Sequence, residues 1–72
     1  MKKPRALRHD VSCEFEGKTY HAQYSIEGGL VTVESLTYGR SQPAKPGPSP
    51  EGIAMLLLRE LLLYAQSQGR LR

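Results

Sequence analysis

The sequence predicts an α+β fold, in which a three-stranded antiparallel β-meander packs on one C-terminal α-helix (βββα). Three observations support this. Apolar and polar residues alternate through three runs between Val11 and Val33, as strands with one buried face require. Glycine-containing pairs separate the runs at the spacing of tight hairpin turns. After a proline-rich segment, apolar residues recur from Ile53 to Ala65 with the period of an amphipathic helix.

The length of 72 residues leaves room for one domain. We expect this domain to span residues 9–69, between a disordered basic arm at 1–8 and a basic tail at 70–72. Chains of this size gain only ~3–5 kcal/mol net from a single core. Stabilisation by a partner chain is therefore expected.

The cysteine content and the apolar runs predict the cellular compartment. Cys13 is the one cysteine, so no disulfide can form within the chain, which favours a reducing, cytoplasmic location. The opening segment, MKKPRALRHD, lacks the apolar region of a signal peptide. The longest apolar run, Ile53 to Leu58, is far shorter than the ~20 residues that span a bilayer, so no membrane association is expected.

The two turns can be tested against the strand faces, because a slip of one residue would move every side chain to the other face. A first two-residue loop at Gly17-Lys18 predicts three cross-strand pairs: Phe15 with Tyr20, Cys13 with Ala22, and Val11 with Tyr24. A second loop at Gly28-Gly29 predicts two more: Ile26 with Val31, and Tyr24 with Val33. Both choices place the apolar residues on the same face of the sheet.

The opposite face of the predicted sheet is polar, so only one face needs a cover. Its members are Ser12, Glu14, Glu16, Thr19, His21, Gln23, Ser25, Thr32 and Glu34, with Leu30, Leu36 and Tyr38 as apolar exceptions. The next segment, YGRSQPAKPGPSP, is rich in proline and glycine, which excludes helix and central strand. We expect it to be a connection.

The C-terminal segment carries the start and stop signals of a helix. Ser49 is the expected N-cap, Pro50 and Glu51 suit the first turn, and Gly69 suits the position after the last turn. At ~100° per residue, one apolar stripe forms. It contains Ile53, Ala54, Leu57, Leu58, Leu61, Leu62, Tyr64 and Ala65, with Met55 at its edge. This stripe is expected to cover the sheet.

Two leucines fall outside the stripe. Leu56 and Leu63, seven residues apart, lie on the polar side of the helix with Arg59 and Glu60. Isolated exposed leucines are common, so chance is one explanation. The other is a homodimer in which both leucines pack against symmetry mates, with Arg59 and Glu60 at the rim. The two unpaired edges of a three-stranded sheet are alternative sites of association. The predicted function is a non-enzymatic interaction module that self-associates through its C-terminal helix.

Side chains with catalytic or metal-binding chemistry are not clustered in the predicted fold. Cys13 faces the core and His21 the opposite side, so they cannot share a zinc ion within one chain. His21 is expected opposite Glu14, and His9 lies beside Asp10 at a strand start. One sheet and one helix offer little concave volume for an active site. The prediction is therefore no enzyme activity, no cofactor, no metal and no small-molecule substrate.

Basic residues support an alternative function, nucleic-acid binding, in a chain of net charge +3. The candidate phosphate contacts are Lys2, Lys3, Arg5 and Arg8 in the arm and Arg40 and Lys45 in the connection, with Arg70 and Arg72 in the tail. Such charges also serve solubility. Tyr38 is the best candidate for stacking on a base, because Tyr20 and Tyr24 are assigned to the core.

Two resemblances follow from these patterns. The segments VSCEFEGKTYHAQYSIEGG and EGIAMLLLRELL resemble, in topology, the later part of a double-stranded-RNA-binding domain. That family has a helix before its first strand and a lysine cluster at its final helix, where this chain has PSPEG. The run EGGLVTVESLTYGRSQ followed by SPEGIAMLLLREL is similar to a group of short uncharacterised bacterial proteins, which implies the same fold and no known activity.

Overall fold

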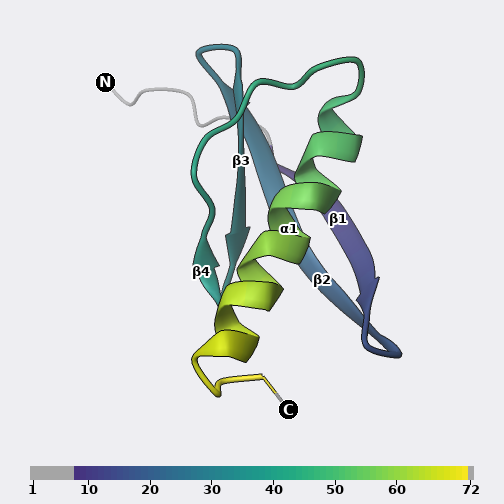
Figure 1. The fold of residues 1–72 in the computed structure, drawn as a ribbon. Coiled ribbons are helices and arrows are strands. Elements are labelled where there is room, and N and C mark those ends of the chain that lie inside the picture. The colour runs from purple at the N-terminus through teal and green to yellow at the C-terminus, as the bar shows by residue number, and fades with distance from the viewer. Residues whose placement is uncertain (1–7, 72) are drawn as a thin grey trace.

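The computed structural model describes residues 8–71 as one antiparallel sheet with one helix against it (Figure 1). The elements are β1 (Arg8–Phe15), β2 (Lys18–Glu27), β3 (Leu30–Ser35), β4 (Gly39–Arg40) and α1 (Pro50–Ser67), with strand order β1-β2-β3-β4. The predicted α+β class and its three main strands are confirmed, and a short fourth strand is added. Arg8, assigned to the basic arm, is the first residue of β1, and the rest of that arm lies outside the described residues.

The first hairpin turns one residue earlier than predicted, at Glu16-Gly17. Both turn residues have positive φ, 54° and 80°, the combination of a type I′ turn, whose twist matches that of the strands. The paired residues are therefore Phe15 with Lys18, Cys13 with Tyr20, and Val11 with Ala22. Moving the turn by one residue shifts every partner by two, so the predicted register was wrong but the predicted faces are right. Glu14 consequently lies opposite Thr19, and His21 opposite Ser12.

The second hairpin confirms the predicted register. Ile26 pairs with Val31 and Tyr24 with Val33, around a turn at Gly28-Gly29. Gly28 and Gly29 have φ values of 58° and 77°, a left-handed conformation that only glycine adopts without strain.

The segment predicted as a plain connection adds to the sheet. Arg40 of β4 pairs with Glu34 of β3. Four residues after Arg40, Ala44 exchanges two backbone hydrogen bonds of 2.7 and 2.9 Å with Val31 of β3. Within this segment, the buried Ser41 accepts the Val33 N–H at its Oγ (2.9 Å) and donates its own N–H to the Val33 carbonyl (2.8 Å). Prolines are compatible with this position because it is an edge. The outer edge of β3 is therefore covered by β4 and by the residues that follow it, up to Ala44.

The helix is capped at both ends as predicted. The Gly52 N–H donates to Oγ of Ser49 (3.1 Å), with Pro50 at the first helical position. At the other end Gly69 has φ 73°, Arg70 N–H donates to the Ala65 carbonyl (2.9 Å), and Gly69 N–H donates to that of Gln66 (3.0 Å). This pair of bonds is a Schellman motif, which ends the helix at a defined residue.

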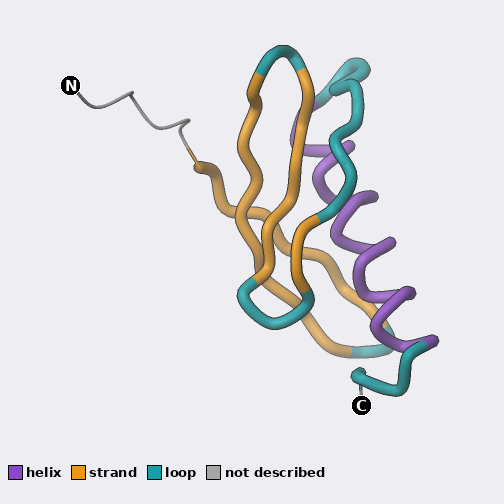
Figure 2. Tube along the Cα trace, turned by 90° about the vertical axis from the view of Figure 1, so that its left-hand side faces the viewer, coloured by secondary structure: helices purple, strands orange, loops and turns teal. Residues whose placement is uncertain are grey.

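α1 lies over one face of the sheet (Figures 1 and 2), and the core is the single layer between them. Its buried apolar members are Val11, Phe15, Val31, Val33, Ala54, Leu57, Leu58, Leu62 and Ala65. Tyr64 was predicted in the buried stripe but is 62% exposed. It lies roughly 100° around the helix from the centre of the buried residues, on a flank that the sheet does not cover.

The one-layer core gives a direct test of which face is buried. Phe15→Ala and Leu57→Ala should each lower the free energy of unfolding by about 2–5 kcal/mol, because they empty buried space. Glu14→Ala and Gln23→Ala, on the open face, should change it by less than about 0.5 kcal/mol. Urea unfolding followed by circular dichroism measures all four. Equal losses from both pairs would contradict the assignment of the faces.

Candidate interaction surfaces

The outer side of α1 carries two leucines that the domain itself does not cover. Leu56 is 58% exposed and Leu63 46%, whereas the leucines at positions 57, 58 and 62 are at most 7% exposed. The expectation that Leu56 and Leu63 point away from the sheet is therefore confirmed. They lie about 10 Å apart along the helix axis, in one line. Arg59 and Glu60, both exposed, lie between them along the chain.

Arg59, exposed on α1, carries a positive charge that acts on the Cys13 thiol of β1. Burial raises the pKa of the half-buried Cys13 thiol above its ordinary value, and the positive charge of Arg59 partly opposes that rise. His21 lines the opposite face of the sheet and cannot act as a base for this thiol. Cys13 is consequently a residue at the edge of the core whose surroundings favour the thiol over the thiolate.

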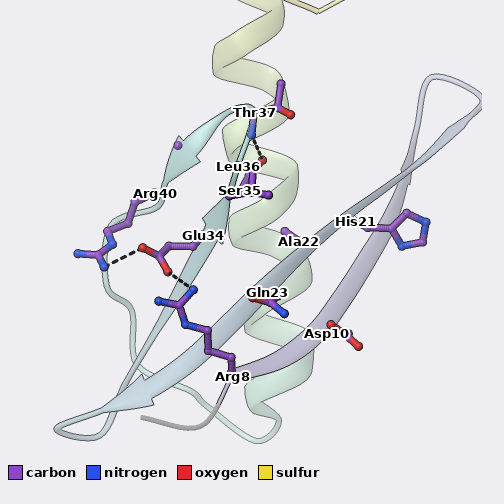
Figure 3. Close-up of a pocket in the computed structure, with 11 residues that line it drawn as sticks. Arg8, Asp10, His21, Ala22, Gln23, Glu34, Ser35, Leu36, Thr37 and Arg40 are labelled. Carbon is purple, nitrogen blue, oxygen red and sulfur yellow. Dashed lines mark hydrogen bonds and ion pairs between the residues drawn. The ribbon is translucent and has the colours of Figure 1, made fainter. Parts of the chain in front are cut away.

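The open face of the sheet is hollowed into a groove of about 630 Å³ (Figure 3). The expectation of little concave volume was wrong, because the β3–β4 turn at residues 36–38 adds a wall beside the twisted strands. The groove is lined by Arg8, Asp10, His21, Ala22, Gln23, Glu34, Ser35, Leu36, Thr37, Gly39 and Arg40. Sequence reasoning did not predict this groove.

Glu34 lies at the centre of the charges in the groove. Its carboxylate binds Arg8 from β1 at 3.0 Å and Arg40 from β4 at 2.9 Å, as the dashed lines in Figure 3 show. Arg40 is the direct cross-strand neighbour of Glu34, whereas Arg8 reaches across β2. These pairs are partly solvated, so each contributes about 0–1 kcal/mol to stability. Two of the eight predicted phosphate contacts thus meet at one carboxylate.

The remaining predicted nucleic-acid contacts do not join this groove. Lys45 is exposed in the loop before α1, and Arg70 donates to the Thr37 carbonyl at 3.0 Å. Residues Lys2, Lys3, Arg5 and Arg72 lie outside the described part of the chain. Tyr38, the predicted stacking residue, instead packs edge-on against Tyr20 with ring centroids 6.1 Å apart, on the core side. The predicted place of Tyr38 on the polar face was wrong, because the turn directs this residue to the core side of the sheet.

The histidines and acidic residues form no metal centre in residues 8–71, where no group of three or more His, Cys, Asp or Glu side chains could hold an ion. His9 stacks on Tyr24 with ring centroids 5.1 Å apart, next to the core. The open face carries Asp10, Glu14, Glu27 and Glu34 against Arg8 and Arg40, so its acidic side chains outnumber its basic ones. The face is polar but not basic.

No family model matches the chain, and neither the search of curated proteins nor that of solved structures finds a match. The resemblances to double-stranded-RNA-binding domains and to short bacterial proteins stay predictions. Over residues 8–71, α1 lacks the length and apolar character that crossing a membrane demands.

The environment of Cys13 predicts its reactivity. Because burial raises the pKa of the thiol, alkylation by iodoacetamide should be slower in the folded chain than in urea at the same mildly alkaline pH. Arg59→Gln removes the opposing charge, so the pKa should rise further and the midpoint of the pH–rate profile should move to higher pH. Mass spectrometry measures the rates. Arg40→Gln, on the other face, is the matched control, and an unchanged profile in Arg59→Gln would contradict this account.

Proposed function

We propose that this protein is a small non-enzymatic interaction module that forms a homodimer through the outer side of α1. The observation that carries the proposal is the exposure of Leu56 and Leu63 in one line on a helix whose Leu57, Leu58 and Leu62 are buried. A reducing cytoplasm is the proposed compartment, supported by the free thiol of Cys13.

The seven-residue interval favours a second copy of the same helix as the partner. About a two-fold axis parallel to the helices, Leu56 and Leu63 each meet their own symmetry mate, as in a short parallel coiled coil. At ~100° per residue, Arg59 and Glu60 lie on opposite sides of the leucine line. In the parallel arrangement, Arg59 of one copy therefore faces Glu60 of the other on both sides of the axis. The antiparallel arrangement would bring the two arginines together, which is unfavourable.

The size of the domain supports association as well. A single layer of nine buried apolar side chains is a small core, and chains of this length gain only ~3–5 kcal/mol net from such a core. Covering Leu56 and Leu63 removes further apolar area from water. A binding event that requires the folded state also stabilises that state.

The helix interface is tested by replacing both leucines with glutamate. Leu56→Glu/Leu63→Glu should convert a dimer at micromolar concentration into a monomer, because like charges would face each other across the two-fold axis. Light scattering gives the mass, and circular dichroism checks that the fold is kept. Leu30→Glu/Leu36→Glu changes two exposed leucines away from α1 and should leave the mass unchanged. A monomeric wild type, or a double variant with the wild-type mass, would refute the helix interface.

Nucleic-acid binding is the second candidate, favoured by the meeting of Arg8 and Arg40 in one groove. Glu34 neutralises both guanidinium groups, so it would compete with a phosphate. If the groove binds nucleic acid, Glu34→Gln should raise the affinity for total cellular RNA or DNA several-fold at low salt, and the affinity should fall steeply as salt is added. Glu14→Gln, on the same face, should raise it less. Absence of binding by both the wild type and Glu34→Gln at low salt would exclude this candidate.

A further inference from the structure

The two edge strands of the sheet differ in length and in their capacity to pair with another strand. β4 has two residues and is followed by prolines at positions 43, 46 and 48, which cannot donate a backbone N–H to another strand. β1 has eight residues, lies at the other end of the strand order, and has no strand on its outer side within residues 8–71 (Figure 1). Of the two edges, only β1 offers a long run of backbone groups for pairing.

The backbone groups that point outward from β1 follow from the hairpin geometry. Phe15 and Lys18 flank a two-residue turn, so they form a hydrogen-bonded pair. Such pairs recur at every second residue along an antiparallel ladder, which assigns Val11 and Cys13 to bonds with β2. The alternate residues of β1 direct their backbone N–H and C=O groups away from β2, toward the open edge: Arg8, Asp10, Ser12 and Glu14.

We infer that β1 pairs with β1 of a second copy, antiparallel and centred on Val11, so that the two sheets become one continuous sheet. Partners across a ladder must share a face, so the axis passes through a residue rather than between two. If the pairing is centred on Asp10, the Asp10 carboxylates of the two copies face each other. If it is centred on Ser12, Asp10 of each copy faces Glu14 of the other, so like charges meet twice. Centring on Val11 places Arg8 opposite Glu14 twice and Asp10 opposite Ser12. To meet Glu14 of the second copy, the Arg8 guanidinium exchanges its partly solvated contact with Glu34 (3.0 Å) for the new carboxylate. The charges of β1 are therefore complementary to themselves in one of these three registers.

The β1 contact differs in chemistry from the helix contact. Pairing would form about eight backbone hydrogen bonds, each a modest net gain because water is displaced from the same groups. On the core side it would place half-buried Cys13 beside His9 of the second copy and cover both. The inference does not depend on the proposed helix interface, because Leu56 and Leu63 lie on the side of α1 away from the sheet. With both contacts, helix dimers would join edge to edge into larger assemblies.

The edge contact is tested in the Leu56→Glu/Leu63→Glu background, where the helix contact is removed. Light-scattering mass should rise from monomer toward dimer between micromolar and near-millimolar concentration. Adding Ser12→Pro removes an outward N–H without touching the bonds to β2, so that chain should stay monomeric while circular dichroism shows the same fold. A background variant that is monomeric throughout, or association that survives Ser12→Pro, overturns the inference. A background variant that keeps the wild-type mass at micromolar concentration refutes the helix interface alone.

The register is tested by complementary charge variants in the same background. Glu14→Arg faces a second arginine at each end of the ladder, and Arg8→Glu faces a second glutamate, so each chain alone should associate at least tenfold more weakly. An equal mixture restores opposite charges at both ends and should associate as the background does. Thr19→Arg places an arginine one strand further in, opposite Glu14, and is the control for the presence of that side chain on this face. A mixture no better than its separate components overturns the Val11 register.

Discussion

The layer between α1 and one face of the sheet is the interaction on which the rest of the structure depends. Leu58 and Leu62 from the helix and Val31 and Val33 from the sheet are almost completely buried there. Because a sheet with one helix can bury one face only, the other face must be polar, and the outer side of the helix must meet water or another molecule. Each remaining surface is a consequence of that single layer.

Two of these surfaces are incomplete in the monomer in different ways. The outer side of α1 exposes apolar area at Leu56 and Leu63, whereas the β1 edge has backbone groups that no other strand of residues 8–71 pairs with. The third surface, the groove around Glu34, is satisfied internally because its carboxylate binds both arginines. Association would therefore cover the exposed leucines and the β1 edge, whereas the charges of the groove are already paired within the chain.

Much of the fold could be predicted because short-range patterns of apolar, polar and glycine residues determine the strands, the turns and the helix. Alternation assigned Phe15 and Val33 to the core even though the first turn was misplaced, since a shift of two residues conserves the face. The fourth strand could not be predicted, because β4 is held by pairing with Glu34 and Ser35, and by the bonds that the following residues Ser41 and Ala44 make to β3, rather than by its own composition. The ion pair between Arg8 and Glu34 joins β1 and β3, which are not neighbouring strands, so the spacing of these residues in the sequence could not predict it.

The central claim is that a small one-layer core is stabilised by self-association. Its most direct test is the midpoint of thermal unfolding of the wild-type chain, measured by circular dichroism over a hundredfold range of protein concentration. If only the folded chain associates, the midpoint must rise with concentration, by mass action. Transitions that superimpose at every concentration would contradict the account and would show that the monomer owes its stability to its own core alone.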